Sequence, residues 1–534
     1  MLYTVMRTLV IALGCTAAGV GAMHMLQAQR YQIPELRRQL RRFGDRTVGA
    51  DVLIAAAAGL LNWYLPMLLS LVIQKEAFRE ELSRWLVLVL FALVCALLCI
   101  FRLQIPQKKP FAVTRRMCRL MLLVFFINLA GCIVLPLLSI TPYLLFAGTD
   151  YAVLVAALIL RPVEDRINAG FYRSAQARLA ARKDLIRIGI TGSFGKTECK
   201  QILKGILSER YRVLATPPSF STAMGVSRVV NEQLRPEHQV FIAEMGAQHK
   251  GEIKELTKLV APKIGVLTCV GNAHLDSFGS IEAAAQTKYE LMQGLPEDGM
   301  AFFGSDASYG DRLYKLCKAE KYRANIGGEV ECYMRAEHVE IGEEGTSFEL
   351  ICADGARARM HTRLLGEYSV RNIALCAAVA RKLGMEIEEI ARGVEKLKPL
   401  RHHLELKRGG EIHVIDDSLN ALPEGAAEAL KVLREFPGRR ILVTAGLTEL
   451  ESDADDKNFA FGTQVKDCAD HVILIGPENT RALMSGMMSR KFPKSAVRMV
   501  RDAADAAALV EEIAETGDSV LYEGVWPEED GEKG

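Results

Sequence analysis

Residues 185–209 read LIRIGITGSFGKTECKQILKGILSE, and three local patterns follow one another in this run without a gap. Apolar residues alternate with other residues over Leu185–Thr191, which predicts a β-strand. Gly192–Thr197 interrupts that alternation, and a helical period resumes over Glu198–Glu209. A strand, a glycine-rich loop and a helix in this order are the context in which a phosphate-binding loop is expected.

The glycine-rich loop has the residue types that phosphate binding requires. Glycines let backbone N–H groups turn inward on phosphate oxygens, and the N-terminus of the next helix adds partial positive charge. Lys196 would neutralise the β- and γ-phosphates of ATP, and the Thr197 hydroxyl would ligate Mg²⁺. The residues expected to bind the nucleotide are Thr191, Gly192, Ser193, Phe194, Gly195, Lys196 and Thr197.

The motif differs from the general P-loop at one position. That loop has a glycine five residues before Gly195, where this chain has Ile190. The pattern here is therefore the shorter T-G-x-x-G-K-T. The alternative interpretation is a chance glycine turn beside a surface lysine.

Several motifs in a fixed order, over about residues 185–525, carry a resemblance to a known family. ITGSFGKT at Ile190–Thr197 resembles the phosphate loop of the Mur ligases, ATP-dependent enzymes that add amino acids to the peptidoglycan stem peptide. Glu244 opens E-M-G-A after an apolar run, as the family's magnesium-binding glutamate does. His274 opens H-L-D-S-F-G-S, which is similar to the branch of the family that adds D-alanyl-D-alanine.

Further along the chain, three more features fit the same family. Lys288 follows His274 by fourteen residues, the spacing of the lysine that is carbamylated in many members. Gly366–Asn372, followed by an alanine-rich stretch, and Val414–Asn420 look like the two signatures nearer the C-terminal domain. Asp417, in the second signature, resembles a residue that contacts the nucleotide or the departing phosphate.

The resemblance implies a mechanism and a set of site residues. ATP converts a carboxylate to an acyl phosphate, which an incoming amine then attacks, so positive charge must gather around several anionic oxygens. The implied catalytic residues are Lys196, His274, Lys288 and Asp417, and Asn420 would also bind the nucleotide. The implied metal ligands are Thr197, Glu244 and His274. For Asp417 and Asn420, a helix N-cap before Pro423–Leu430 is the alternative.

The chain departs from the family pattern at positions outside the phosphate loop and the metal ligands. The departing residues are Ser221, Cys269, Tyr368, Ser369, His403, Leu419, Leu422 and Ala445. His403 replaces an arginine in the family's H-R-L motif, and Tyr368 and Ser369 replace a usual His-Asn pair. ATP binding is therefore the firmer expectation, and the identity of the added amino acid is left open.

Charge is divided unevenly along the chain. The first 160 residues carry 16 basic and 7 acidic side chains, a net charge of +9, while the whole chain has a net charge of +2. Such asymmetry indicates a membrane or nucleic-acid contact, and hydropathy favours the membrane because 121–160 contains a single charged residue, Asp150. No stripe of basic and aromatic residues indicates nucleic-acid binding.

Five apolar segments lie near the length of ~20 residues that a spanning helix needs. They run at about 2–23, 51–73, 85–101, 120–139 and 142–160. The connections 24–50 and 102–119 carry six Lys/Arg each, which predicts that both are cytoplasmic and that the N-terminus is outside. Two alternatives are the cleavage of residues 2–23 as a signal peptide and a re-entrant pair over 120–160.

We therefore expect a helical transmembrane region of about five helices, an α/β Mur-ligase central P-loop domain and a Rossmann-like α/β C-terminal domain. Three strand-like runs near the C-terminus alternate with helical ones, as in a parallel sheet; they are Ile441–Thr444, His471–Ile475 and Ser519–Tyr522. The expected boundaries are 1–161 for the transmembrane region, 162–184 for a linker helix, 185–400 for the central domain and 401–534 for the C-terminal domain.

These features predict a multi-pass protein of the cell membrane whose catalytic domains are cytoplasmic. Twelve cysteines without a C-x-x-C pair fit a reducing cytosol. Soluble family members begin with a domain that grips the uridine nucleotide of the substrate, and the 23 residues 162–184 are too few to form one. The acyl acceptor is therefore expected to be a lipid-linked or membrane-presented muropeptide, joined to an amino acid or dipeptide.

Three competing functions were considered beside an amide ligase of the D-alanyl-D-alanine-adding type. One is another ligase of the superfamily, such as a poly-glutamate type synthase. Another is a pseudo-ligase that binds ATP and acts as a scaffold or regulator of cell-wall synthesis. The third is a transport ATPase, which is disfavoured because the chain has no L-S-G-G-Q signature.

Overall fold

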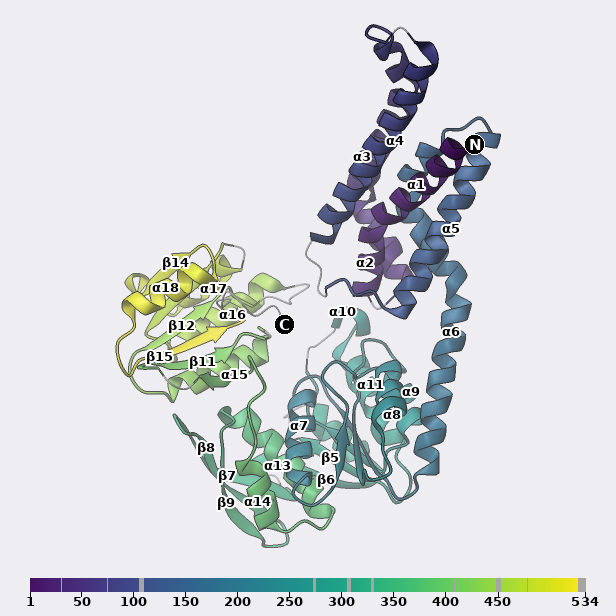
Figure 1. The fold of residues 1–534 in the computed structure, drawn as a ribbon. Helices are drawn as coiled ribbons and strands as arrows, with labels where there is room; N and C mark the ends of the chain where they lie inside the picture. Colours follow the sequence, from purple (N-terminus) through teal and green to yellow (C-terminus); the bar gives the residue numbers. More distant parts are fainter. Residues whose placement is uncertain are drawn as a thin grey trace. The chain divides into compact units, whose positions relative to one another are not determined.

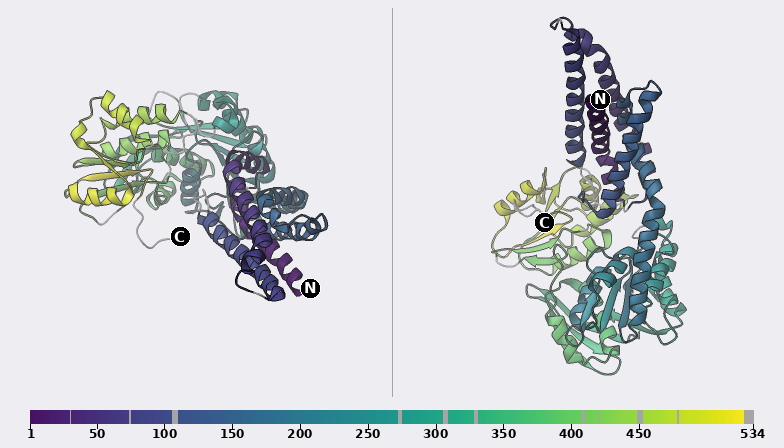
Figure 2. Two further views of the ribbon diagram at one scale, coloured as in Figure 1. Left: turned by 90° about the horizontal axis from the view of Figure 1, so that it is seen from above. Right: turned by 45° about the vertical axis from the view of Figure 1, so that its right-hand side comes forward.

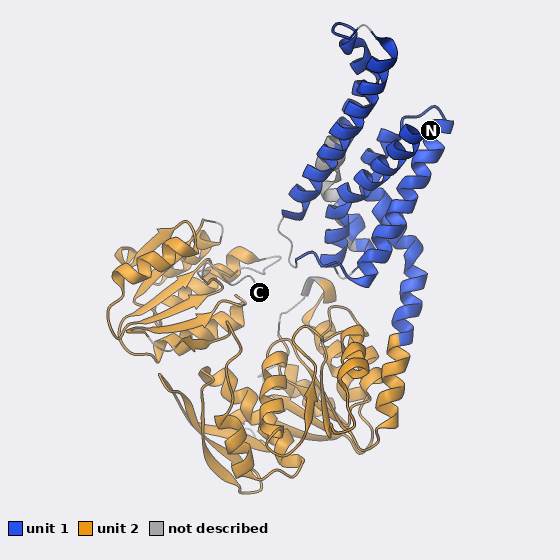
Figure 3. Cartoon of the chain, in the orientation of Figure 1, with its two compact units in different colours: residues 1–170 blue, residues 171–534 orange. Residues whose placement is uncertain are grey.

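The computed structural model describes residues 1–29, 31–73, 75–104, 110–271, 275–304, 309–327, 331–407, 410–419, 421–447, 453–477 and 479–526. The chain divides into two compact units, Met1–Gly170 and Phe171–Gly534 (Figure 3). Each unit has its own core and is described by itself.

Unit 1 is built from helices (Figure 1). They are α1 (Leu2–Ala18), α2 (Val20–Ala28), α3 (Ile33–Leu69), α4 (Glu76–Gln104), α5 (Arg115–Leu137), the 3₁₀ helix η1 (Pro142–Gly148) and the first part of α6 (Thr149–Ala181). Helices α3 and α4 lie side by side and run in opposite directions (Figure 1, Figure 2). The core of this unit is apolar and includes Ile11, Phe91 and Phe146.

Five stretches of helix in the described residues are long and apolar enough to cross a membrane, judged by length and composition. They are Leu2–Ala28, Asp51–Leu69, Glu76–Gln104, Arg115–Leu137 and Pro142–Ala181. Each corresponds to one of the five apolar segments found in the sequence. Large apolar side chains such as Trp63, Leu68 and Leu97 are exposed on these helices.

The helices of unit 1 extend beyond the apolar segments that predicted them. Helix α3 begins at Ile33, so much of the expected loop 24–50 is helical. Helix α6 begins at Thr149 and continues to Ala181, so most of the expected separate linker 162–184 belongs to the same helix as the last apolar segment. Hydropathy marks where a helix becomes polar, whereas the backbone hydrogen bonds continue through polar residues until a cap or a breaker ends them.

Ion pairs join helices of unit 1 in its interior. Arg102 on α4 donates two hydrogen bonds to Asp51 on α3, at 2.8 and 2.9 Å, and its guanidinium lies 3.7 Å from Asp150 on α6. Arg119 on α5 makes a bidentate pair with Glu164 on α6, at 2.7 and 2.9 Å. Asp51, Asp150 and Glu164 are each at most 5% exposed, so these pairs fix how the helices are placed against one another.

Unit 2 contains two α/β domains, and the first of them is built on a nine-stranded sheet. Its strand order is β2 (Val213–Ala215), β3 (Val240–Glu244), β1 (Ile186–Thr191), β4 (Ile264–Leu267), β5 (Met300–Gly304), β6 (Glu320–Ile326), β7 (Met334–Gly342), β8 (Gly345–Cys352) and β9 (Arg357–Thr362). The pairs from β2 to β7 are parallel, while β7, β8 and β9 form an antiparallel meander.

Helices cover both faces of this sheet, as a parallel sheet requires. They are α7 (Lys196–Leu207), α8 (Ala223–Gln233), α9 (Glu252–Val260), α10 (Leu275–Phe278), α11 (Ile281–Gln293), α12 (Tyr309–Leu316), α13 (Gly366–Lys382) and α14 (Ile387–Glu395). One core cluster packs α7, α13 and α14 on the sheet, and a second packs α8, α9 and α11 on it. The strand β3, next to the edge strand β2, is buried along its whole length.

The second α/β domain of unit 2 is built on a six-stranded sheet near the C-terminus. Its order is β10 (Glu405–Lys407), β11 (His413–Asp417), β15 (Ser519–Glu523), β12 (Arg440–Thr444), β13 (His471–Ile475) and β14 (Val497–Val500). All pairs are parallel except β10 with β11. Its helices are α15 (Pro423–Arg434), α16 (Ala454–Val465), α17 (Thr480–Ser489), the 3₁₀ helix η2 (Lys494–Ala496) and α18 (Ala503–Ile513).

Candidate functional site

The phosphate loop lies between β1 and α7, where two glycines let the chain turn. Gly195 has a φ of 73°, a left-handed conformation, and is the N-cap of α7. At Gly192 a Cβ atom would lie 1.9 Å from the Thr268 hydroxyl oxygen, so a side chain does not fit there. Both glycines are therefore needed for the path of the loop.

Hydrogen bonds hold the loop against the ends of the neighbouring strands. The Ser193 hydroxyl donates to the Gly271 carbonyl at 3.1 Å and accepts from the Gly271 N–H at 2.9 Å. The Thr191 hydroxyl donates to the Met245 carbonyl at 3.0 Å. Lys196 Nζ donates to the Gly192 and Ser193 carbonyls, at 2.8 and 2.9 Å. The lysine ammonium thus stays folded over its own loop, where a bound phosphate would meet it.

The carboxylate of Glu244, the last residue of β3, accepts hydrogen bonds from two side chains near the start of α7. The Thr197 hydroxyl lies 3.0 and 3.1 Å from its two carboxylate oxygens. Lys200 Nζ forms a 2.6 Å ion pair with Oε2 and is completely buried. Burial makes this pair costly to break, because either charge alone would be left without a partner in the interior.

The arrangement of Thr197 and Glu244 fits a magnesium site. A hydroxyl and a carboxylate are oxygen donors of the kind that Mg²⁺ prefers, and their mutual hydrogen bonds place them close enough to share one ion. The third predicted ligand, His274, lies outside the described residues. Among the described residues there is no group of three or more His, Cys, Asp or Glu side chains that could hold a metal.

Lys288, on α11, is buried at 3% exposure, with its Nζ 5.1 Å from the centre of the Phe278 ring. Burial, with a smaller contribution from the nearby positive charge of Lys196, lowers the pKa of Lys288 to about 8. The neutral amine form of this lysine is therefore more populated near neutral pH than that of an exposed lysine. Only the neutral amine is nucleophilic, and a lysine must be in this form to react with CO₂ and become carbamylated.

The start of α7 is also tied to α13 by a buried carboxylate. Glu198 accepts hydrogen bonds from Ser369 Oγ and Asn372 Nδ2, both at 2.7 Å. Tyr368, beside them, is half-buried, and its hydroxyl has no hydrogen-bond partner among the described residues. A Cβ at Gly195 would lie 2.4 Å from that hydroxyl, so Tyr368 packs directly on the phosphate loop.

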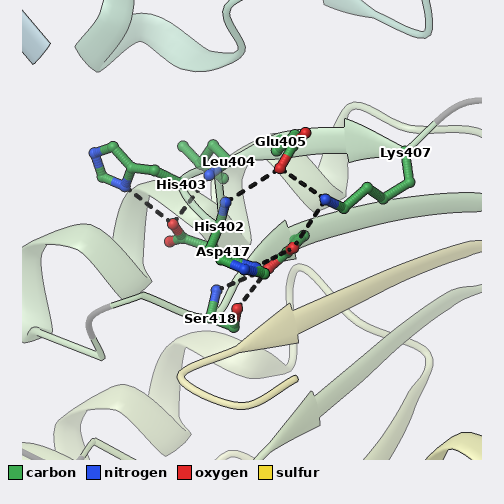
Figure 4. Close-up of polar contacts among 8 residues, drawn as sticks. His402, His403, Leu404, Glu405, Lys407, Asp417 and Ser418 are labelled. Atoms are coloured by element: carbon green, nitrogen blue, oxygen red, sulfur yellow. Dashed lines mark hydrogen bonds and ion pairs between the residues drawn. The ribbon is translucent and has the colours of Figure 1, made fainter. Parts of the chain in front are cut away.

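Asp417 ends β11, at the carboxyl edge of the second sheet (Figure 4). Its Oδ1 accepts from the backbone N–H of Leu404 at 3.0 Å and lies 3.2 Å from Nδ1 of His403. The N-cap of α15 is Leu422, which makes no side-chain capping bond. The alternative role of Asp417 as a helix cap is therefore wrong. Asn420 lies outside the described residues.

One cavity of about 1200 Å³ is lined by residues from both α/β domains of unit 2. It is lined from the first sheet by the loop residues Ser193–Thr197 and from the second by His403 and Asp417. Its wall also includes four further cations, namely Lys204, Arg371, Lys396 and Lys398. Six predicted site residues, namely Ser193–Thr197 and Asp417, thus line one space, whereas Glu244 and Lys288 are not among its lining residues.

Sequence reasoning did not predict Lys200, Glu198 or His403 as members of this site. Lys200 could have been found from its position, because residues 197 and 200 are three apart on a helix and therefore share a face. Glu198 depends on partners 171 and 174 residues away, which no local pattern reveals. His403 was noted only as a departure from the family pattern.

Comparison with known protein families gives two matches in unit 2. Residues 190–380 match the Mur ligase middle domain. Residues 402–525 match the Mur ligase, glutamate ligase domain. The first match contains the phosphate loop and Glu244, and the second contains His403 and Asp417, so the two matched regions meet at the cavity.

Similar proteins share the name UDP-N-acetylmuramoyl-tripeptide–D-alanyl-D-alanine ligase. The one from Bacillus subtilis is 28% identical over 340 residues, which is 63% of this chain and 72% of the relative. The one from Mycobacterium tuberculosis is 33% identical over 275 residues, or 50% of this chain and 53% of the relative. The chain thus spans between about half and about three quarters of these relatives.

Solved structures agree with this likeness. MurF from Acinetobacter baumannii has a TM-score of 0.60 and 25% identity, covering 67% of this chain and 77% of that one. MurF from Thermotoga maritima, solved in complex with ADP, has a TM-score of 0.59 at 22% identity and shows the shared fold. With both of its ligase domains matched, in order and around one cavity, the chain belongs to the Mur ligase family of ATP-dependent ligases.

Proposed function

We propose that this chain is a membrane-bound, ATP-dependent acid–amino-acid ligase that forms an amide bond by way of an acyl phosphate. The observation that carries the proposal is the cavity lined by both the phosphate loop and the Asp417 edge of the second sheet. A ligation brings together a nucleotide, a carboxylate and an amine. A cavity between two α/β domains, at the carboxyl ends of their parallel strands, is suited to hold all three.

In the first step, phosphoryl transfer to the carboxylate, different residues have different proposed roles. Forming an amide from a carboxylate is uphill, so the terminal phosphoryl group of ATP is first transferred to the carboxylate oxygen. Lys196 and the backbone N–H groups of the loop bind and orient the phosphates. Thr197, Glu244 and His274 would hold Mg²⁺, which when bound offsets negative charge on phosphate oxygens. Asp417 and Asn420 would contact the nucleotide or the departing phosphate.

Lys288 completes the proposed catalytic group as a carbamate. Its burial and its pKa of about 8 support the reaction of its neutral amine with CO₂. The product would carry a carboxylate at the end of a long stem. Carbamylation replaces the buried positive charge of Lys288 with a negative one. The positive charge of the nearby Lys196 ammonium stabilises this negative charge.

For the substrates, the names of the relatives support peptidoglycan stem-peptide synthesis of the D-alanyl-D-alanine-adding type. We propose a dipeptide or amino acid as the amine and a lipid-linked or membrane-presented muropeptide as the acyl substrate. Unit 1 supports the second part, because apolar helices directly precede the ligase domains in the chain.

For location, we propose five crossings of the cell membrane, with the N-terminus outside and the ligase domains in the cytoplasm. Exposed apolar side chains on the helices of unit 1 support contact with lipid. The arginine-rich connections support the orientation. We also propose the domain boundaries 1–161, 162–184, 185–400 and 401–534, with a Rossmann-like last domain supported by its five parallel strands.

The proposal is tested by ADP release from purified full-length protein in detergent or lipid nanodiscs. Each lipid-linked and each UDP-linked muropeptide is combined with D-alanyl-D-alanine, D-alanine or glutamate. We expect ADP release that needs both an acyl substrate and an amine, with the lipid-linked form preferred. Equal turnover of the soluble UDP-linked form would show that the membrane-presented substrate is wrong, while the ligase activity stands.

A further inference from the structure

Two successive histidines near the start of the second sheet each face an aspartate fourteen residues later (Figure 4). His402 Nδ1 lies 2.8 Å from Asp416 Oδ2, and His403 Nδ1 lies 3.2 Å from Asp417 Oδ1. The backbone that presents them is strained, because His402 has a φ of 63° and Leu404 a φ of 43°. Neither residue is a glycine, so surrounding contacts must hold this conformation.

The two pairs differ in what surrounds them. Asp416 is completely buried and also binds Ser418, through N–H and hydroxyl, and Lys407 at 3.3 Å. His402 and Asp416 are therefore part of a structural network that does not line the cavity. His403 and Asp417 both line the cavity that holds the phosphate loop, and the His403 side chain is 34% exposed. Because Nδ1 faces Asp417, Nε2 is the ring nitrogen left for a ligand.

Charges around this pair favour a basic histidine. Glu523, paired with Asp417 in the register of β11 and β15, is completely buried, and its carboxyl oxygens have no hydrogen-bond partner among the described residues. Burial and the charge of Asp417 raise the pKa of Glu523 well above its usual range, which favours the protonated, neutral form of this neighbour. Burial lowers the pKa of His403, but Asp417 on β11 and the charge of Glu198 on α7 outweigh it and raise that pKa above its usual value.

We propose that His403 is the general base that takes a proton from the incoming amine through Nε2, and that Asp417 is the residue that positions it. The inference rests on the proposed ligase function and adds a residue to it. An arginine at this position has only donors and cannot accept a proton. The histidine therefore gives this chain a group for amine activation inside the cavity.

The proposed step balances in atoms and charge. An α-amino group has a pKa of about 7.7–8.0, so most of it is a non-nucleophilic ammonium at neutral pH. His403 accepts one proton from that ammonium, and the freed lone pair attacks the carbonyl carbon of the acyl phosphate. The C–O bond to phosphate then breaks and phosphate leaves. The second proton lost from nitrogen goes to the phosphate or to solvent, and His403 returns its proton to solvent.

The test compares two nucleophiles on full-length protein in nanodiscs. Hydroxylamine is mainly uncharged at neutral pH and attacks an acyl phosphate without the help of a base, giving a hydroxamate. His403→Asn keeps a side-chain N–H that can donate to Asp417 but has no basic nitrogen. His402→Asn is the matched control, since it changes the neighbouring His–Asp pair that lies outside the cavity. Melting temperatures of both variants show whether each one folds.

We expect His403→Asn to lower kcat/KM for the amine substrate at least about 100-fold, the usual size of a general-base contribution. Hydroxamate formation should stay close to that of the unchanged protein, and His402→Asn should keep both activities. In the unchanged protein kcat/KM should rise with pH as His403 is deprotonated, whereas in His403→Asn the rise should follow only the deprotonation of the amine substrate, whose pKa is about 7.7–8.0. Should His403→Asn misfold, His403→Arg supplies the same comparison.

Three results would overturn the inference, and they are distinguishable. If the unchanged protein forms amide and His403→Asn retains its rate and its pH profile, His403 is not the base although the ligase function holds. If the unchanged protein forms neither amide nor hydroxamate with any acyl substrate, the ligase function itself fails. A loss of both reactions in well-folded His403→Asn would assign the residue to substrate binding and also contradict a role as a base.

Discussion

Three lysines near the phosphate loop differ because their surroundings differ. Lys196 is folded over the Gly192 and Ser193 carbonyls, Lys200 is paired with Glu244, and Lys288 is buried against Phe278. Only the first of them lines the cavity. Position in the site, rather than residue type, therefore separates the lysine proposed to bind phosphate from the lysine of a buried ion pair and from the lysine proposed to be carbamylated.

The position of Lys196 leads to the first prediction. Lys196→Ala removes the one loop side chain that can neutralise nucleotide phosphates, and its truncation leaves the buried Lys200–Glu244 pair intact. We expect amine-dependent ADP release to fall at least about 100-fold, as when a charge-stabilising donor is removed, with little change in melting temperature. Unimpaired turnover by this variant would contradict the assigned role.

Lys288 gives a prediction with a spectroscopic readout. Because its pKa is lowered to about 8, the neutral amine that reacts with CO₂ is present above that pH and is lost as the pH falls below it. We expect a carbamate carbon signal in ¹³C NMR after labelling with bicarbonate, growing between about pH 7 and 9. Lys288→Gln is the control and should lack the signal. A spectrum that does not change on this substitution would exclude carbamylation of Lys288.

At the residue scale, the sequence predicts local chemistry better than distant partners. Thr197 and the loop glycines follow from a motif of eight residues, and Glu244 from a short apolar strand and its ending. The bonds from Ser369 and Asn372 to Glu198 join positions more than 170 residues apart, and their existence depends on how α13 packs against α7. Such contacts arise from tertiary packing, which no local pattern encodes.

At the scale of elements, the interior ion pairs of unit 1 are its most sensitive contacts. Arg102→Met leaves Asp51 buried and unpaired, which we expect to cost about 3–5 kcal/mol in the free energy of unfolding. Arg161→Met is the control, because its partner Asp165 is 67% exposed and such pairs contribute at most about 1 kcal/mol. Denaturant titrations in micelles compare the two. Equal losses would show that burial of the pair does not matter.

Element ends were the least predictable feature of the fold. Strands at the phosphate loop and near the C-terminus lie within one residue of the expected runs, because alternation and buried apolar runs define them directly. Helix α6 instead passes through Pro162 and into a polar region, so composition alone placed a boundary inside it. The antiparallel strands β7–β9 were not predicted at all.

For the whole molecule, the uneven charge of the sequence fits its division into two units. The basic excess falls in residues 1–160, within unit 1, and the acidic excess falls in the part that contains the ligase domains. In the proposed mechanism, the positive charge that the phosphates need is therefore local and comes from Lys196 and the cations of the cavity wall. The basic excess instead supports an orientation in the membrane.

That orientation can be measured with a thiol reagent that does not cross membranes. Cys118 is exposed and lies at the start of α5, next to a connection proposed to be cytoplasmic. We expect it to react only after the membrane is permeabilised. Ser139→Cys, at the exposed end of the same helix region, should react from outside in otherwise cysteine-free protein. The opposite pattern would reverse the proposed topology.

The central claim is that this membrane-associated chain makes amide bonds at the expense of ATP. The most direct measurement is ADP and amide formation by the full-length protein with paired acyl and amine substrates, beside Lys196→Ala. We predict equal amounts of ADP and amide, formed only when both substrates are present and abolished in the variant. Absence of amide with every substrate pair, together with full complementation of a gene deletion by Lys196→Ala, would contradict the claim and favour a scaffold.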